Sequence, residues 1–377
     1  MNRTTLLAAA ALATAAGSAS AQFWTIDASF GLSQGISDNG IVTGDSLTGG
    51  PYFLWNQTSG ATTIGGASAG QGVGGQPKIS NDGAYVAGTR FNAAGGYYEM
   101  GRYTVATGTW EGFGTFAGYG TQIDQSVSSG YNISGDGRSV VGLGWTSLGT
   151  ADTHAMQWME GTGVIDLGTA TTGESARANA VDFDGNVVAG WQDGAGRQGS
   201  VWVDGVQTLI FKDDGGIAQE AFAVSDDGRY VTGLGLGSFF AAGHAYRYDT
   251  LTDTYLELTN IAGGESRMAG AAINGDGSLI GGGTWGLGPA TFGTALMWTE
   301  DEGTMTLTDY LDMNNIAYDP SFNFAFVSDI SSDGQWITGW GNYGTPASTQ
   351  SFVIQVPAPS SMAFIAMGSL FAARRRR

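Results

Sequence analysis

A five-residue pattern that recurs seven times constrains the fold of this chain more than any other feature of its sequence. Each copy begins with Ile or Val and ends with Gly, and an Asp or Asn precedes that glycine. The copies occupy Ile36–Gly40, Ile79–Gly83, Ile133–Gly137, Val181–Gly185, Val224–Gly228, Ile273–Gly277 and Ile330–Gly334. The closing glycines lie 43, 54, 48, 43, 49 and 57 residues apart, a mean of 49, which is a typical length for one blade of a β-propeller.

The residues after each copy indicate a hairpin. Apolar strands that end in Gly follow the pattern, as in Val140–Gly142, Val187–Gly190 and Tyr230–Gly233. Asn-Gly and Asp-Gly pairs favour type I′ hairpin turns, because both central residues of such a turn need positive φ. We therefore interpret these aspartates as turn residues and expect no cofactor. Calcium binding is the weaker alternative, since Asn39 supplies turn geometry without a charge in the first copy.

A third strand follows each hairpin and ends in a large apolar residue. These residues are Trp55, Tyr103, Trp158, Trp202, Tyr248 and Trp298, with Phe352 and Ile354 in the last copy. Packing between blades explains a feature repeated so often better than a ligand site does.

A fourth strand is visible in several copies, for example at Val164–Gly168, Tyr255–Leu258 and Thr62–Gly65. The seventh copy lacks one, whereas a strand at Phe23–Asp27 precedes the first copy without an assigned partner. We expect this N-terminal strand to pair with residues 350–356 and so to remove an exposed sheet edge.

The composition agrees with this architecture. Gly contributes 64 residues, Pro 7 and Cys none, which favours Gly-rich turns and excludes disulfides and cysteine chemistry. The predicted fold is all-β, a single seven-bladed β-propeller of four-stranded blades over residues 22–355, closed by the N-terminal strand. Hydrophobic helices are expected only at the two terminal signals.

The N-terminus has the features of a secretory signal. Arg3 precedes an apolar stretch from Leu6 to Ala16, and the small residues Ala19-Ser20-Ala21 follow. This order of positive, apolar and small residues predicts a signal peptide over residues 1–21, cleaved between Ala21 and Gln22.

The C-terminus has the parts of a second signal. It contains Val356-Pro357-Ala358-Pro359, an apolar segment from Met362 to Ala373, and then Arg374, Arg375, Arg376 and Arg377. This order resembles the sorting tail of PEP-CTERM exported proteins, although Ala358 stands where that family has Glu. The resemblance covers residues 356–377 and implies transient membrane anchoring, cleavage by an exosortase-type protease and release to the cell surface or extracellular matrix. The alternative is an uncleaved hydrophobic anchor.

The repeat itself resembles the HAF-type repeat of exported bacterial proteins. The resemblance lies in the Ile-Ser-x-Asp-Gly core with Val-Val and Gly after it, as at Ile133–Gly142, and in His154-Ala155 or His244-Ala245 before the third-strand aromatic residue. It covers roughly residues 31–356 and implies an extracellular β-propeller-like domain of no established activity.

The chain is strongly acidic. Its formal charge is −19, and removal of Arg3 and the four C-terminal arginines takes the mature chain to −24. Such a surface repels nucleic acid and anionic lipid and favours solubility. Nucleic acid is therefore not an expected partner.

The sequence assigns no catalytic, cofactor or metal-binding residue. His154 and His244 occupy equivalent positions, four residues before Trp158 and Tyr248, and unrelated residues stand there in the other repeats, so we interpret them as rim residues. Gly31–Gly35 matches the G-x-S-x-G string of serine hydrolases, but that turn needs a helix after it, and a strand is expected here. Carboxylate pairs for glycoside cleavage stay open, because separation in space decides that mechanism.

Two connections are longer than the rest, Phe113–Gly130 and Thr306–Phe326. They carry aromatic residues suited to sugar stacking, and the candidate ligand residues are Phe116, Tyr119, Tyr310, Tyr318 and Phe322. Anchoring of the loops themselves is the alternative role. A short helix is expected over Leu307–Asn315, with Thr308 or Asp309 near its start.

These features favour a non-enzymatic exported repeat protein, a structural or ligand-binding component of the cell surface or extracellular matrix. Its expected partners are the sorting protease and an extracellular polysaccharide or another surface protein. The alternative is a polysaccharide-active hydrolase or lyase on the same scaffold, because a fold does not fix a function.

Overall fold

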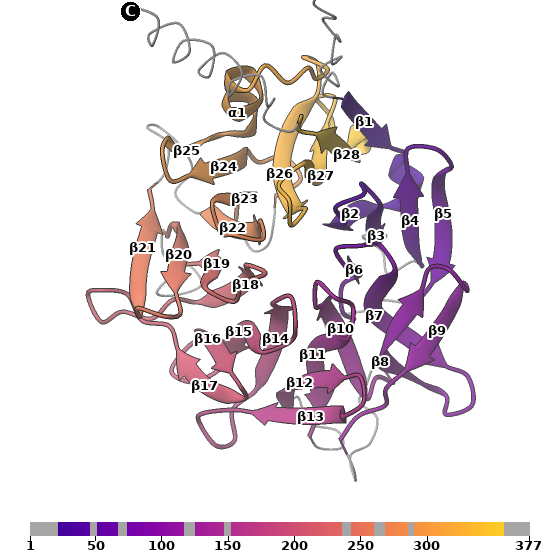
Figure 1. Ribbon diagram of the computed structural model, residues 1–377, viewed down its shortest axis with the longest axis vertical. Helices are drawn as coiled ribbons and strands as arrows, with labels where there is room; N and C mark the ends of the chain where they lie inside the picture. The colour runs from indigo at the N-terminus through magenta and orange to yellow at the C-terminus, as the bar shows by residue number, and fades with distance from the viewer. Residues whose placement is uncertain are drawn as a thin grey trace, which may run out of the picture.

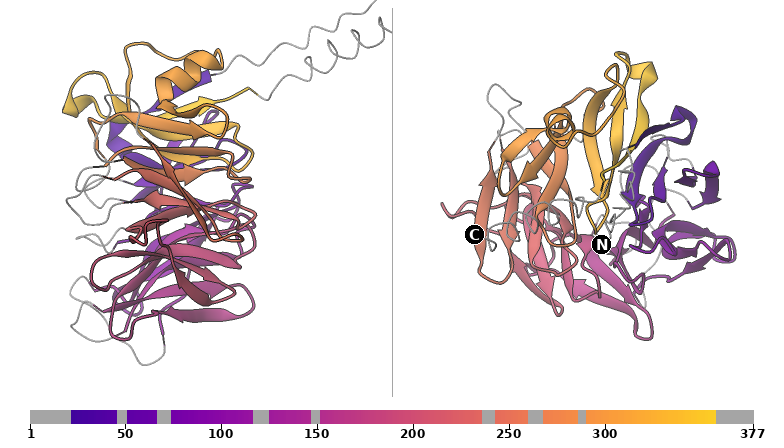
Figure 2. Two further views of the ribbon diagram at one scale, coloured as in Figure 1. Left: turned by 90° about the vertical axis from the view of Figure 1, so that its left-hand side faces the viewer. Right: turned by 45° about the horizontal axis from the view of Figure 1, so that its top comes forward.

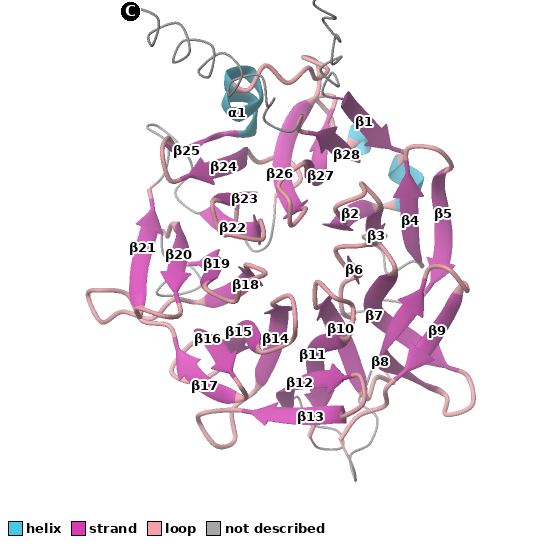
Figure 3. Ribbon diagram, viewed as in Figure 1, coloured by secondary structure: helices cyan, strands magenta, loops and turns pink. Residues whose placement is uncertain are grey.

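The computed structural model describes residues 22–45, 51–66, 74–116, 125–146, 152–235, 243–259, 268–285 and 290–357. Over these residues the chain forms a ring of antiparallel sheets around a central axis (Figure 1), and the ring is a thick disc when seen from the side (Figure 2). Strands make up nearly all of the regular structure, and one α-helix lies at the rim (Figure 3). The fold is therefore all-β and of the β-propeller class, as predicted.

Five of the sheets have four strands each, and every strand pairs with the next one along the chain, from the axis outwards. They are formed by β2 (Leu32–Ile36), β3 (Val42–Asp45), β4 (Tyr52–Asn56) and β5 (Gly60–Gly65); β6 (Lys78–Ile79), β7 (Tyr85–Asn92), β8 (Tyr97–Thr104) and β9 (Thr109–Gly112); β10 (Ser128–Ile133), β11 (Ser139–Trp145), β12 (Thr153–Met159) and β13 (Gly163–Gly168); β14 (Ala176–Val181), β15 (Val187–Gln192), β16 (Gln198–Val203) and β17 (Val206–Leu209); and β18 (Glu220–Val224), β19 (Tyr230–Leu234), β20 (Ala245–Asp249) and β21 (Thr254–Leu258). The predicted fourth strands are confirmed as β5, β13 and β21.

The remaining sheet has eight strands, where the repeat predicts two separate sheets of four. It contains β22 (Met268–Ile273), β23 (Leu279–Thr284), β24 (Ala295–Thr299), β25 (Gly303–Thr306), β26 (Asn323–Ile330), β27 (Trp336–Asn342), β28 (Gln350–Gln355) and β1 (Gln22–Ile26). One residue pair, Gly283 with Phe326, joins its two halves. The long strand β26 therefore reaches β23, and two four-stranded units are joined at this one point.

The N-terminal strand completes the ring, as predicted. Strand β1 pairs antiparallel with β28, so that residues 22–26 lie opposite residues 351–355. Trp24 lies beside Trp336 of the same sheet and Trp55 of the next sheet, with ring centroids 6.0 and 6.1 Å apart. The first strand thus bonds to one sheet and packs against its neighbour.

The seven turns differ from the predicted type I′ geometry. In the first copy Gly40 has φ +74°, its N–H donates to Ser37 O at 3.0 Å, and Ser37 N–H donates to Ile41 O at 3.0 Å. Asn39 is not among the described residues with positive φ. The loop is thus a three-residue connection, in which a type I turn is followed by a left-handed glycine. Only the glycine needs positive φ, and the other six have φ between +69° and +91°.

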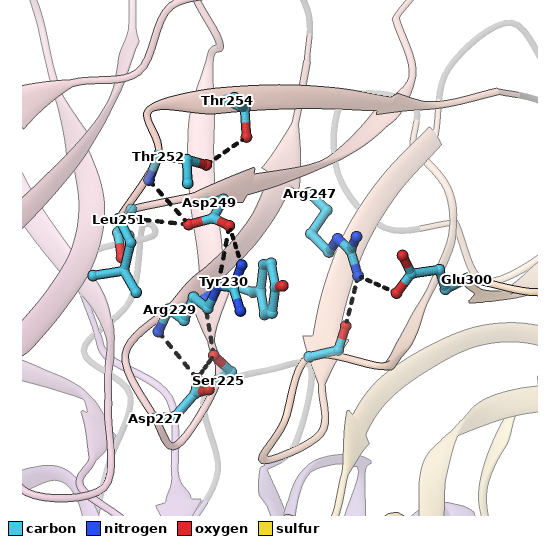
Figure 4. A network of polar contacts seen from close by, with 12 residues as sticks. Ser225, Asp227, Arg229, Tyr230, Arg247, Asp249, Leu251, Thr252, Thr254 and Glu300 are labelled. Carbon is cyan, nitrogen blue, oxygen red and sulfur yellow. Dashed lines mark hydrogen bonds and ion pairs between the residues drawn. The ribbon is translucent and has the colours of Figure 1, made fainter.

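Side chains of the repeat hold the turn in shape, as Ser225 and Asp227 illustrate (Figure 4). Ser225 Oγ donates to Asp227 Oδ1 at 2.6 Å, and Arg229 N–H donates to the same oxygen at 3.0 Å. Asn39 takes the place of the aspartate in the first turn, where it accepts from Ser37 Oγ at 2.6 Å. The position therefore needs a hydrogen-bond acceptor rather than a charge, as expected for a turn residue.

Hydrogen bonds link each turn to the next around the axis. Six of them join backbone groups over 2.8 to 3.4 Å, from Asp38 N to Asn81 O, Asn81 N to Gly135 O, Asp136 N to Phe183 O, Phe183 N to Asp226 O, Asp227 N to Gly275 O and Gly275 N to Ser332 O. The seventh joins Asp333 N–H to the Asp38 carboxylate at 3.1 Å. The turns thus form a closed circuit, which ties the inner ends of all the sheets together.

The innermost strands carry a β-bulge at the same place in six of the seven repeats. One residue of the strand is left without a partner across the pair, and these residues are Gln34, Tyr131, Asn179, Phe222, Ala271 and Ser328. Each lies two positions before the Ile or Val that begins the turn pattern. A bulge redirects the extra side chain, so one residue per repeat is aimed differently from its neighbours.

A glycine in the second strand permits each bulge. A Cβ atom on Gly190 would lie 2.0 Å from Arg177 O, and Cβ atoms on Gly142 and Gly233 would meet the equivalent carbonyls at 1.9 and 2.0 Å. Real Cβ atoms do not come so close to a carbonyl oxygen. The glycine that ends each apolar strand in the sequence is therefore required by the close approach of the inner strand.

The third-strand aromatic residues pack between neighbouring sheets, as predicted. Trp202 is fully buried in a cluster with Val141 and Ala155 of the preceding sheet, and its indole N–H donates to Leu167 O at 3.1 Å. The other buried members are Trp55, Tyr248, Trp298, Phe352 and Ile354, and Tyr103 and Trp158 are partly buried. This packing holds the sheets together away from the turns.

The helix α1 spans Leu307–Met313, close to the range predicted. Its cap is Thr306, earlier than the predicted Thr308 or Asp309, because Thr306 Oγ1 accepts from the N–H of Asp309 at 3.0 Å. Within the described part of the chain, no helix is long and apolar enough to cross a membrane.

We expect Gly190→Ala to lower the free energy of unfolding by about 3 kcal/mol, since the new methyl group would collide with backbone rather than with a movable side chain. Gly199→Ala in β16 is the matched control, because its Cβ would meet Ala218 at an ordinary 3.5 Å. Urea denaturation followed by tryptophan fluorescence measures both variants. Equal stabilities would contradict the role assigned to the bulge.

Candidate ligand-binding cavity

A cavity of about 290 Å³ lies where the innermost strands face the axis. Each innermost strand from β2 to β26 contributes one or two side chains to its lining. All six bulged residues line it. The β-bulge, which recurs in six of the seven repeats, therefore supplies side chains to the walls of the cavity.

One wall is aromatic. Phe222 of β18 contacts Trp285, which follows β23, with ring centroids 4.9 Å apart. Trp285 lies 6.1 Å from Phe326 of β26, and Phe326 stacks on Trp340 of β27 at 4.8 Å with 15° between the ring planes. These four rings form a continuous apolar surface, which we call the aromatic wall.

Most of the remaining lining is polar, and we call it the polar wall. It consists of Gln34, Gln76, Lys78, Arg177, Asn179, Arg197, Gln219 and Glu220. Arg177 lies 4.3 Å from the Tyr131 ring centroid and 5.2 Å from that of Trp191, and its Nε donates to Asn179 Oδ1 at 2.7 Å. Ring contacts and hydrogen bonds thus fix the direction of this guanidinium group.

Each cation of the polar wall has an acidic partner. Arg197 Nη1 donates to Glu220 Oε1 at 2.6 Å, and Arg197 Nε lies 3.4 Å from Asp193 Oδ1. Burial disfavours the charged form of Arg197, but Glu220 and Asp193 more than offset it, so that its pKa is raised. Arg177 lies 3.7 Å from Glu220.

Lys78 is compensated in the same way. Its Nζ lies 3.4 Å from Asp329 Oδ1 and donates to Ser328 O at 3.3 Å. Burial raises the pKa of Asp329, whereas Lys78 and the N–H of Ile36 act against that rise. The polar wall is therefore made of paired charges rather than of free ones.

Gln219 of this wall has a buried polar atom without a hydrogen bond. Its side chain is 5% exposed, and its Oε1 has no partner among the described residues. An unpaired buried acceptor destabilises a protein by about 1–3 kcal/mol. A ligand hydroxyl that donated to Gln219 would remove this penalty.

The turns close one end of the cavity. Asp226 reaches across the axis, where its Oδ2 accepts from Asn81 Nδ2 at 2.6 Å and from Ser332 Oγ. Between this bridge and the main cavity lies a polar space of about 70 Å³, which Lys78 and Asp329 also line. We call the Asp226 bridge and the circuit of turns the floor.

The candidate ligand residues of the two long connections lie elsewhere. Phe116, Tyr310 and Phe322 are buried in hydrophobic clusters, and Tyr318 packs against one of them while its hydroxyl donates to Asp312 at 3.0 Å. Tyr119 is outside the described residues. Packing is the role that the structure gives the four described side chains, and ligand binding by them stays a prediction.

The histidines and the hydrolase-like string do not contribute to the cavity. His154 Nδ1 lies 2.9 Å from Asp166, and His244 Nδ1 contacts Glu257; both pairs link a third strand to a fourth. Ser33 is buried within β2, its Oγ donates to Gly339 O at 2.8 Å, and no helix follows it. The described residues hold no cluster of three or more His, Cys, Asp or Glu side chains suited to a metal ion.

The two terminal signals lie almost entirely outside the described residues. Val356 and Pro357 follow β28, and Gln22 begins β1. The other predicted signal residues, Ala21, Ala358, Pro359, Arg374, Arg375, Arg376 and Arg377, are not described. Export and sorting therefore stay predictions.

Sequence reasoning missed the residues that line the cavity. The usable signal was the position two before the Ile or Val of each turn pattern, which holds Gln34, Pro77, Tyr131, Asn179, Phe222, Ala271 and Ser328. This position varies in chemistry, while the residue two positions later is always Ile or Val. Variation within a constant repeat marks a place where side chains are not needed for packing.

Comparison with known proteins supports the fold and nothing finer. No protein family profile matches the chain, and no curated protein does. The β-propeller domain of the trilobed protease from Pyrococcus furiosus matches with a TM-score of 0.53 and 13% identity, over 86% of this chain and 94% of that one. That domain is described as having an open velcro topology, whereas β1 pairs with β28 here.

Two bacterial structures are also similar. An oligogalacturonate lyase from Vibrio parahaemolyticus matches with a TM-score of 0.51 and 13% identity, over 90% of this chain and 97% of that one. TolB from Acinetobacter baumannii matches with a TM-score of 0.43 and 13% identity over 73% of this chain, and the match spans 62% of TolB. The likeness to the protease domain and to the lyase, whose TM-scores exceed 0.5, establishes the β-propeller fold alone at 13% identity.

The acid behind Gln34 gives the region a pH dependence. Gln34 Nε2 donates to Asp45 Oδ1 at 3.4 Å. Burial raises the pKa of Asp45 from 3.8 to about 7, and the hydrogen bond from Gln34 offsets only part of this rise. Between about pH 4 and pH 7 the folded protein therefore holds a proton that the unfolded chain releases.

We expect the free energy of unfolding to fall as the pH rises from about 4 to about 7, because the folded state loses this proton only at the higher pH. Above that range Asp45 should cause no further change. Asp45→Asn should flatten the profile by up to about 4 kcal/mol, at about 1.4 kcal/mol for each unit of pKa. Chemical denaturation at a series of pH values measures the profile, with the exposed Asp301→Asn as the control. Parallel profiles for the wild type and Asp45→Asn would contradict the assignment.

Proposed function

We propose that this protein is a non-enzymatic exported β-propeller of seven blades, and that it binds a glycan of the cell surface or extracellular matrix in its central cavity. The observation that carries the proposal is the division of the cavity into an aromatic wall and a polar wall. A sugar ring has an apolar C–H face and a rim of hydroxyl groups. Such a ring fits a space with stacked aromatic rings on one side and amides and a guanidinium on the other.

The count of seven follows from treating the eight-stranded sheet as two blades. Each half has the four strands, the turn and the third-strand apolar residue of the other sheets, and one residue pair joins the halves. The seven turns in the hydrogen-bonded circuit support the same count.

Export and sorting rest on the two terminal signals. Pairing of β1 with β28 brings Gln22 opposite Gln355, so the predicted cleavage site and the predicted sorting motif leave the domain at the same edge.

The absence of catalysis is favoured by how the carboxylates near the cavity are used. Glycoside cleavage needs two carboxyl groups that flank the scissile bond. Glu220 is held by Arg177 and Arg197, and Asp226 by Asn81 and Ser332. Asp45, with its raised pKa, is the observation that favours the alternative function, a polysaccharide-active hydrolase or lyase.

We expect Trp285→Ala to weaken glycan binding by at least about tenfold, equivalent to about 1.4 kcal/mol, because it removes the centre of the aromatic wall. Thermal-shift screening of uncharged and acidic extracellular polysaccharides identifies the ligand, and calorimetry measures the affinity. The exposed aromatic variant Phe211→Ala is the control and should bind as the wild type does. Binding that Trp285→Ala leaves unchanged would place the ligand outside the cavity, and release of soluble sugar products would establish the alternative.

Intact-mass analysis of the exported protein tests the two signals. A mass that begins at Gln22 and ends near the Pro357 motif is expected if both are processed. A mass that includes residues 360–377 would instead identify an uncleaved anchor.

A further inference from the structure

We propose that the cavity receives the end of an uncharged glycan chain, taking its terminal one or two sugar residues rather than an internal stretch. This inference rests on the proposed function and adds the charge of the ligand and the part of the chain that is bound.

The floor decides which part of a chain can enter. The circuit of turns draws the inner ends of the sheets together, and Asp226 spans the axis between Asn81 and Ser332. Gly275 is packed so tightly there that an added Cβ would meet Ser332 Oγ at 2.4 Å. A polymer can pass through a channel only if both ends are open, and the turns close this one.

The size of the cavity sets how much of the chain is bound. Its volume of about 290 Å³ is at the lower end of the range for small-molecule sites, which is about 300–1,000 Å³. Such a space fits one or two sugar rings. The rest of the chain must then leave on the side away from the floor.

The pairing of charges selects an uncharged sugar. Arg197 is engaged by Glu220 and Asp193, and Lys78 by Asp329. A ligand carboxylate would have to compete with these acids in a confined space, and the formal charge of −19 that the whole chain carries would repel it. A neutral ligand meets neither cost.

Hydrogen-bonding groups remain for the hydroxyls of such a sugar. Gln219 Oε1 is an acceptor without a partner among the described residues. The Arg177 guanidinium has five N–H groups, of which Nε–H bonds to Asn179, while Glu220 stands 3.7 Å from Nη2. An acceptor and spare donors therefore face a ring that stacks on Trp285.

Chain-length dependence tests the proposal. Size-fractionated linear glucan, mannan and galactan provide uncharged chains in short, medium and long fractions, and calorimetry gives the affinity and stoichiometry for the full mature protein. If chain ends bind, Kd is constant when expressed per mole of chains, and one chain end binds each protein. If internal segments bind, Kd is constant per unit mass and long chains carry several proteins, which would overturn the proposal but not the proposed function.

Matched fractions of oligogalacturonate provide the acidic comparison and should bind at least about tenfold more weakly. Preferential binding of the acidic series at the cavity would overturn the neutral specificity. Gln219→Leu should weaken binding of the short neutral fraction, whereas Phe211→Ala should not. If no fraction binds, or if Trp285→Ala and Gln219→Leu bind as the wild type does, the proposed function fails as well.

Discussion

The circuit of hydrogen bonds between the seven turns is the constraint on which the rest of the structure depends. Sheets in a ring pack mainly against their neighbours, so their inner ends need a common frame to keep a regular spacing. The turns provide it, because each one donates to the next and leaves few of its backbone groups to water. Asp38 supplies the last acceptor with its side chain, which closes the circuit between the seventh turn and the first.

This frame separates the positions that build the molecule from those that give it chemistry. Four positions of the repeat serve the fold. They are the turn serine and aspartate, the strand glycine and the third-strand aromatic residue. The bulged residue, present in six of the seven inner strands, does not serve the fold in this way. The glycine of the neighbouring strand leaves room for the close approach of the inner strand. The bulged residue can change from Gln34 to Phe222 or Ser328 without loss of the pairing around it. The cavity is thus composed one residue at a time on a constant scaffold.

Features that depend on local chemistry could be predicted from the sequence. The turns, the strands after them and the closing strand at residues 22–26 follow from short motifs and from a missing partner in the seventh repeat. The turn type was wrong, because Asp-Gly also suits a three-residue loop in which only the glycine has positive φ. The cavity could not be predicted, because a bulge is recognised only when the pairing of two strands is known. In the sequence, Gly190 only indicates the end of a strand. Phe116 and Tyr310 pack in hydrophobic clusters, and the sequence could not show this, because aromatic residues that anchor a loop have the same composition as those that face a ligand.

The pairing of β1 with β28 means that the ring can close only when the first and the last strands of the domain are both present. Strand β1 cannot pair until β28 is available, more than 300 residues later along the chain. Contacts between residues so far apart in sequence form slowly. A chain that stopped anywhere before residue 350 would keep an open sheet edge and an unshielded Trp24. Open edges invite pairing with other chains. A shortened domain would therefore keep an exposed sheet edge, and only a domain with all seven repeats forms a closed ring.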